Sequence, residues 1–355
     1  MRRTFLAVMA ALLLLSFLAV PSSARPTRWA VCGEWRRVAV PDEDTLGRLT
    51  GVAIVSPDEA WAVGSLGDES VSASLALHWT GMRWERATFP KTAQLNAVTV
   101  ASATDVWAVG SRDARTMPED TPPHLFTARW TGTRWESMPT ELQLRGTLED
   151  VAAIPGTRQL WAVGYGVDSA PLVIRWTGER WHRASVPLDR GHLTGVVAFR
   201  ESAWAVGYVG ERMIALRWDG SRWHRIDAPA GFASSIDGTR PDRLWAVGGD
   251  GSEHPALFRW NGARWFRVWT GTGKGYLSGV VVPAPGVVWA VGTRSFTEPR
   301  PLVVRRGSDG WHAATIKGAS GYLTAIDGTP NNLWVTRFSN YPDYEPPYFD
   351  TYHRC

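Results

Sequence analysis

The chain has 355 residues, of which 44% are hydrophobic and 20% charged, and its formal net charge is +4. Arginines recur at fixed positions of a sequence repeat, for example Arg129, Arg175 and Arg217, and do not gather in one stretch. Charge spread in this way does not form the one-sided basic stripe of nucleic-acid-binding proteins, so no nucleic-acid partner is expected. We expect these guanidinium groups to stack on neighbouring tryptophans.

The chain starts with the pattern of a secretory signal peptide. Two arginines precede an apolar run over residues 5–20, and small residues follow up to Ala24. The run is short for a membrane span, and the small residues suit a cleavage site. We predict a signal peptide over residues 1–24, one exported domain over residues 25–355, and no membrane span.

A lipid anchor at the first cysteine is the rival interpretation of this N-terminus. Arg28 and Trp29 lie between the apolar run and Cys32, where a lipidation signal needs small apolar residues. We therefore expect a secreted protein and not a lipoprotein.

A tryptophan phrase returns seven times along the chain. The complete phrase is Trp-Ala-Val-Gly, and its copies begin at Trp61, Trp107, Trp161, Trp204, Trp245 and Trp289. The last copy is degraded to Trp-Val-Thr-Arg and begins at Trp334. Self-similarity at a period of roughly 40–50 residues is typical of solenoids and propellers.

Each unit of the repeat predicts four short strands. In the unit over residues 193–229, β-branched and alternating segments are separated by a polar turn at Glu201-Ser202 and a hairpin at Asp219-Gly220. Four such strands without helical periodicity indicate a propeller blade. Tryptophans at fixed repeat positions are expected to pack between blades. Trp269 lies outside this pattern and is a candidate for an exposed contact.

The two ends of the chain are incomplete units that complement each other. The C-terminal part predicts three strands near residues 323–326, 333–337 and 348–354, and residues 32–41 match the fourth strand of other units. The sequence thus predicts an all-β, seven-bladed propeller of four-stranded antiparallel blades whose last blade contains both termini. Cys32 and Cys355 then occupy the place of a hairpin turn, and we predict a disulfide between them.

These units resemble those of secreted bacterial seven-bladed β-propellers, loosely of the kelch or galactose-oxidase kind. Only Gly248-Gly249 shows the paired glycines typical of kelch blades, and no WD dipeptide is repeated. Copper chemistry of the galactose-oxidase kind needs a tyrosine–cysteine crosslink, and both cysteines are already assigned to the disulfide. No metal or other cofactor is therefore expected, and we expect a monomer.

Candidate site residues are those at which the repeats differ. Aligned first strands open with Arg48, Gln94, Thr147, His192, Phe232, Tyr276 and Tyr322. Two residues further, on the same side of an alternating strand, are Thr50, Asn96, Glu149, Thr194, Ser234, Ser278 and Thr324. These residues are expected to surround the mouth of the propeller channel.

The residues expected at the channel mouth suggest two alternative functions. The first is non-catalytic binding of an extracellular protein, glycan or small molecule, with Arg48 as an anion contact, Gln94 and Asn96 as polar contacts, and Phe232, Tyr276 and Tyr322 as walls. The alternative is a metal-independent lyase, hydrolase or cyclase that uses Glu149 and His192 as acid and base.

Loops between the second and third strands form a second candidate surface. The segments Arg112–His124 and Ser339–Pro347 are rich in charged residues and tyrosine respectively, which suits recognition of a protein or glycan. Solvated mouth and loop residues that bind nothing remain the simpler alternative at this stage.

Overall fold

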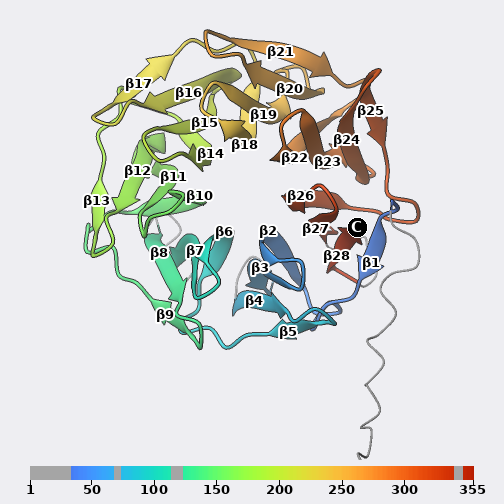
Figure 1. Ribbon diagram of the computed structural model, residues 1–355, viewed down its shortest axis with the longest axis horizontal. Helices are drawn as coiled ribbons and strands as arrows, with labels where there is room; N and C mark the ends of the chain where they lie inside the picture. Colours follow the sequence, from blue (N-terminus) through green and yellow to red (C-terminus); the bar gives the residue numbers. More distant parts are fainter. Residues whose placement is uncertain (1–32, 68–72, 113–122, 340–346) are drawn as a thin grey trace, which may run out of the picture. The chain divides into compact units, whose positions relative to one another are not determined.

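Strands alone build the ring, apart from one short 3-10 helix, η1 (Val167–Ser169). The computed structural model describes residues 33–67, 73–112, 123–339 and 347–355, and in these ranges it contains 28 strands in seven four-stranded antiparallel sheets. Figure 1 shows the sheets arranged as blades around a central channel, with the first strand of each blade innermost. The predicted seven-bladed propeller is therefore confirmed. No helix in these ranges is long and apolar enough to cross a membrane.

The first three blades follow the chain in order. Blade 1 contains β2 (Gly47–Ser56), β3 (Glu59–Leu66), β4 (Ala73–Trp79) and β5 (Trp84–Arg86). Blade 2 contains β6 (Gln94–Ser102), β7 (Asp105–Arg112), β8 (His124–Trp130) and β9 (Trp135–Ser137). Blade 3 contains β10 (Gly146–Ala153), β11 (Leu160–Gly166), β12 (Pro171–Trp176) and β13 (Trp181–Arg183), with η1 between β11 and β12.

The remaining blades complete the ring. Blade 4 contains β14 (His192–Ala198), β15 (Ala203–Val209), β16 (Arg212–Trp218) and β17 (Trp223–Ile226). Blade 5 contains β18 (Phe232–Arg240), β19 (Arg243–Gly249), β20 (Pro255–Trp260) and β21 (Trp265–Thr270). Blade 6 contains β22 (Gly275–Ala284), β23 (Val287–Arg294), β24 (Arg300–Gly307) and β25 (Gly310–Ala314). Blade 7 contains β26 (Tyr322–Thr329), β27 (Asn332–Phe338), β28 (Phe349–Arg354) and β1 (Arg36–Val38).

The repeated tryptophans join each blade to the next. Trp61 of blade 1 lies with its ring centroid 4.8 Å from that of Trp130 and 5.1 Å from that of Trp135, both in blade 2. Trp161 of blade 3 meets Trp218 and Trp223 of blade 4 at 5.0 and 5.1 Å. Large rings buried in this way explain why the phrase recurs, and the predicted packing role is confirmed.

The off-pattern tryptophan is less exposed than expected. Trp269 is half-buried and packs against the cluster that joins blades 5 and 6, which includes Trp245 and Leu277. A register shift in the pairing of β20 with β21 places it there. Trp269 is therefore mainly a packing residue of the outermost strand.

Arginines of the third strands stack over these same tryptophans, as predicted. The guanidinium carbon of Arg175 lies 5.1 Å from the ring centroid of Trp161, and that of Arg259 lies 5.5 Å from Trp245. Blade 1 uses a histidine instead, since His78 stacks on Trp61 at 4.3 Å. The repeated basic residues therefore contribute cation–π contacts within blades.

The glycine of the phrase allows the first strand to approach closely. A Cβ atom at Gly64 or at Gly207 would lie only 1.9 Å from the carbonyl oxygen of Arg48 or His192 respectively. The register of all seven first strands shifts just after this point, and the residues skipped in the pairing are Thr50, Asn96, Glu149, Thr194, Ser234, Ser278 and Thr324. Such a β-bulge re-aims the skipped side chain. The simple alternation assumed for these strands is therefore wrong at this position.

Blade 7 is composed of both ends of the chain, as predicted. β1 pairs antiparallel with β28, with Arg36 opposite His353 and Val38 opposite Thr351. The N–H of Gly33 donates a hydrogen bond to the carbonyl of Cys355 at 3.1 Å, in the place of a hairpin turn. Cys32 lies outside the described residues, as does the predicted signal peptide, so the disulfide and the cleavage site remain predictions.

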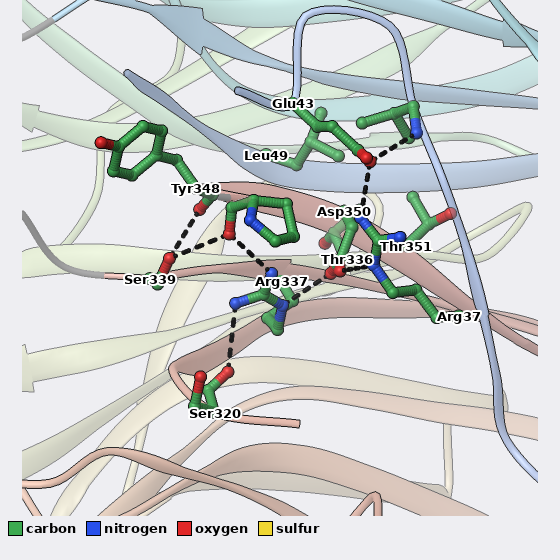
Figure 2. A network of polar contacts seen from close by, with 12 residues as sticks. Arg37, Glu43, Leu49, Ser320, Thr336, Arg337, Ser339, Tyr348, Asp350 and Thr351 are labelled. Carbon is green, nitrogen blue, oxygen red and sulfur yellow. Dashed lines mark hydrogen bonds and ion pairs between the residues drawn. The ribbon is translucent and has the colours of Figure 1, made fainter. Parts of the chain in front are cut away.

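A buried ion network holds the composite blade together (Figure 2). Asp350 of β28 accepts hydrogen bonds from Nε of Arg337 in β27 and from Nε of Arg37 in β1, both at 2.6 Å. Arg337 is 4% exposed and Asp350 is fully buried. Arg37 also pairs with Glu43 at 2.7 Å. Arg337 stands where the other six blades have the glycine of the phrase, so the degraded seventh copy provides the charge that anchors β1.

Candidate functional site

The channel is a cavity of about 1110 Å³, with walls formed by the first strands of all seven blades. All seven bulge residues line it. Most of them also hold the ring together: the hydroxyl of Thr50 donates to the carbonyl of Leu95 in the next blade at 2.7 Å, and that of Thr194 donates to Ala233 at 2.7 Å. Asn96 has the same role, since its amide donates to the carbonyl of Leu148 at 2.8 Å. The repeated polar ring is therefore structural.

Glu149 is the exception in this ring because it is a carboxylate where the other blades have a hydroxyl or an amide. Burial raises the pKa of Glu149, whereas attraction to Arg48 and a hydrogen bond from Thr147 act in the opposite direction. Because an ionised carboxylate only accepts hydrogen bonds, Glu149 cannot donate to a carbonyl of the next blade as Thr50 and Thr194 do. Glu149 thus provides a desolvated acidic group at a position where a donor is the rule.

Three aspartates lie deeper in the wall. The carboxylates of Asp150, Asp237 and Asp327 each accept a hydrogen bond from a backbone N–H of the next blade, at 2.8, 2.6 and 2.8 Å. Burial raises the pKa of Asp150 to about 7 and that of Asp237 to about 6, and it also raises the pKa of Asp327. These side chains connect blades, yet they remain part of the channel wall.

The channel lining has an excess of acidic side chains, whereas the whole chain has a net positive charge. Its described lining contains one basic side chain, Arg48, and five acidic ones, Glu149, Asp150, Asp168, Asp237 and Asp327. The whole chain has a net charge of +4. In a concave, partly desolvated site such an excess of one sign attracts ligands of the other sign.

An aromatic cluster flanks the channel at blades 3 and 4. The ring of His192 is stacked on that of Tyr165 with a centroid distance of 3.9 Å, and the ring of Tyr208 lies 5.3 Å from it. Nε2 of His192 is 3.0 Å from the hydroxyl of Ser169, and burial lowers the pKa of His192. Phe232 extends the cluster, 6.1 Å from Tyr208.

Two further aromatic pairs lie at blades 6 and 7. Tyr276 is stacked on Phe296 at 6.2 Å, and Tyr322 on Phe338 at 5.1 Å. Phe296 is exposed, whereas Tyr322 is buried. The mouth therefore has a polar side, at blades 1 to 3, and an aromatic side, at blades 3 to 7.

The predicted site residues fall into two groups. Arg48, Gln94, Asn96 and Glu149 line the channel. The side chains of His192, Phe232, Tyr276 and Tyr322 are outside its described lining and take part in the aromatic contacts. The bulge residues of all seven blades line the channel, whereas the opening residues differ: those of blades 1 to 3 line it, and those of blades 4 to 7 do not.

The proposed acid/base pair has separate surroundings. Glu149 interacts with Thr147 and Arg48, whereas His192 contacts Ser169 and the two tyrosines beside it. Burial, and after it the charge of Glu149, raises the pKa of the Tyr208 hydroxyl, so Glu149 acts on the cluster electrostatically. No described group of three or more His, Cys, Asp or Glu side chains could hold a metal ion.

Several residues that line the channel were not predicted from the sequence. Asp237 and Asp327 occupy the same position of their first strands, where other blades have Ala53, Val197 or Val281, and this departure from the repeat was a usable signal. Asp168 belongs to η1, which no repeat pattern predicts. Of the two long loops proposed as a second surface, residues 113–122 and 340–346 lie outside the described part of the chain.

Comparison with known proteins supports the fold alone. No protein-family description matches the sequence, and no curated protein matches it. Among solved structures, one described as YCF48 bound to a D1 peptide superposes with a TM-score of 0.61 at 14% identity and covers 91% of this chain and 96% of the other. A structure of U3-55K gives 0.62 at 12% identity, covering 91% and 98%. The RRP9 WD40 repeats give 0.62 at 12% identity, covering 90% and 97%. The chain is thus a seven-bladed β-propeller by structure.

Proposed function

We propose that this protein is an exported, non-catalytic propeller that binds a protein, glycan or small molecule through its channel mouth. The observation that carries the proposal is Glu149. At its position five other blades donate a hydrogen bond from a hydroxyl or an amide to the next blade, whereas Glu149 is a desolvated carboxylate that lines the cavity. A carboxylate that costs free energy to bury and cannot donate such a bond when ionised is more readily explained by a ligand than by the fold.

The aromatic cluster beside Glu149 supports the same conclusion. Tyr165 lines the channel, and His192 and Tyr208 extend the surface outward. Rings with polar edges next to a charged group are common in ligand sites on rigid scaffolds. The YCF48 structure mentioned above contains a D1 peptide, so peptides are the first class of ligand to test here.

Catalysis by Glu149 and His192 is the alternative. It requires the two groups to reach one substrate, and their direct contacts are to different neighbours. Binding experiments in which turnover is also measured separate the two hypotheses.

A thermal-shift screen of residues 25–355 against peptides, glycans and metabolites tests the proposal. Ligands of the mouth should lose most of their stabilising effect in Glu149→Gln and part of it in His192→Ala. Glu179→Gln, an exposed carboxylate on the outer hairpin of the same blade, is the matched control and should bind as the unchanged protein does. Hits that survive both mouth substitutions would place the site elsewhere. Mass spectrometry of each hit after incubation would support the enzyme hypothesis if product appears and is lost in Glu149→Gln.

Export is tested separately. Expression of the full chain in a secreting bacterial host should release a protein that starts at Arg25, as determined by N-terminal sequencing. A product that keeps Met1 and stays in the cell would contradict the predicted signal peptide.

A further inference from the structure

We infer that the ligand presents an organic cation, a guanidinium or ammonium group, to blade 3, where Glu149, Asp168 and the ring of Tyr165 line the channel. This inference rests on the proposed binding function and specifies the chemistry of the ligand. It is drawn from the geometry of one blade and from the charge of the channel as a whole.

Blade 3 brings the three side chains to one part of the cavity. Glu149 is the bulge residue of β10, and Tyr165 is near the end of β11, opposite Thr147 of β10 in the strand register. Asp168 follows in η1, directly after β11. All three line the cavity. Burial, and after it the charge of Glu149, raises the pKa of the Tyr165 hydroxyl.

The turn that carries Asp168 is held in place by the aromatic cluster. Asp168 and Ser169 both have left-handed backbone conformations, with φ of 54° and 57°. The Ser169 hydroxyl lies 3.0 Å from Nε2 of His192, whose ring is stacked on Tyr165. A cation that contacts Tyr165 and Asp168 would therefore meet a backbone turn that a hydrogen bond already holds, which lowers the entropic cost of binding.

The acidic lining of the channel favours a positively charged ligand. The described lining of the channel contains five acidic side chains and one guanidinium, and attraction to Arg48 lowers the pKa of Glu149 by less than burial raises it. A positive group would compensate the excess charge, whereas an anion would add to it. Because Tyr165 lines the channel, an organic cation that can make a cation–π contact as well as an ion pair fits better than a metal ion.

Short capped peptides provide the test. Binding of acetyl-Gly-X-Gly-amide to the mature protein is measured by calorimetry, where X is arginine, lysine, citrulline, norleucine or glutamate. Arginine and lysine peptides should bind, and the neutral or acidic ones should bind at least about tenfold more weakly, as expected for loss of a partly desolvated charge pair. Free arginine amide and lysine amide distinguish a small-molecule source of the cation from a peptide.

Substitutions locate the site. Glu149→Gln should weaken the arginine peptide by about tenfold or more, and Tyr165→Leu by about three- to fivefold. Glu179→Gln should leave the affinity unchanged. Far-ultraviolet circular dichroism and melting curves of each variant check that the fold is retained. Equal affinity for the arginine and citrulline peptides, no binding of either cation, or unchanged affinity in Glu149→Gln would overturn the inference.

Failure of this inference and failure of the proposed function give different results. If the broad screen finds neutral or anionic ligands whose binding depends on Glu149 or His192, the mouth is a binding site but the cation assignment is wrong. If no ligand of any class depends on these residues, the proposed function itself is wrong.

Discussion

Replacement of Asp350 by asparagine tests the idea that one buried carboxylate holds the two ends of the chain together. The carboxylate of Asp350 accepts hydrogen bonds from Nε of Arg337 and from Nε of Arg37, each at 2.6 Å (Figure 2). Asp350 is fully buried. Asparagine has almost the same shape and keeps one acceptor oxygen, so the packing of β28 is preserved while the negative charge is removed.

The expected loss of stability follows from the exposure of the two arginines. Arg337 is 4% exposed. Removing the partner of a buried charge typically lowers the free energy of unfolding by about 3–5 kcal/mol. We take about 3 kcal/mol here because the asparagine oxygen can still accept one hydrogen bond. The side chain of Arg37 is 39% exposed and keeps Glu43, so its share is below about 1 kcal/mol. Asp350→Asn should thus lower the free energy of unfolding by about 3–4 kcal/mol, out of a total of roughly 5–15 kcal/mol for a typical domain.

Urea denaturation monitored by tryptophan fluorescence measures this change. The double variant Asp350→Asn with Arg337→Met removes the stranded charge as well and should recover part of the loss. Asp242→Asn, which breaks an exposed pair with Arg240, should have no measurable effect. A loss below about 1 kcal/mol in Asp350→Asn, or a double variant less stable than the single one, would refute the reasoning.

Three further predictions concern the termini, the channel and the mouth. The predicted disulfide between Cys32 and Cys355 would make the protein two hydrogens lighter than its dithiol form in intact-mass analysis without reductant; two alkylatable thiols would exclude the bond. Burial raises the pKa of Asp150 to about 7. Between about pH 4 and pH 7 the folded state therefore keeps a proton on Asp150 that the unfolded chain has released. The free energy of unfolding should fall as the pH rises through this range. Asp150→Asn should reduce that fall by about 2 kcal/mol in denaturation curves at pH 5 and pH 8, and an unchanged slope would contradict the shifted pKa. Finally, a Cβ at Gly249 would lie 2.4 Å from the ring of Phe232, so Gly249→Ala should displace this ring and weaken mouth ligands that touch it, while a melting temperature and affinity equal to those of the parent would contradict the contact.

The architecture could be predicted because it depends on local sequence features that occur in each repeat. A tryptophan at a fixed position, a glycine three residues later and a hairpin after the third strand are local signals, and each recurs often enough to align the units. The composite blade was also predictable, since residues near Trp35 match a strand that the C-terminal part lacks, and Trp35 does contact Trp289 of blade 6 at 6.0 Å.

The site was predictable only in part because its geometry depends on a bulge. Period-two alternation places His192 and Thr194 on the same side of their strand, and the sequence has no local signal for the extra residue that separates them. Because of the bulge, the adjacent residues Glu149 and Asp150 both line the channel. Regular alternation would place them on opposite faces of the strand. Contacts such as that of Ser169 with His192 depend on a turn that occurs in one blade only.

The composite blade also affects the order in which the protein can fold during synthesis. Arg37 leaves the ribosome early, yet the carboxylate that it binds is 313 residues later in the chain. At common rates of translation of about 5–20 residues per second, β1 has no partner for about 15–60 s while the first six blades form. We therefore expect misassembly and chaperone binding to concentrate at the stage when the edge of the unfinished ring is unpaired.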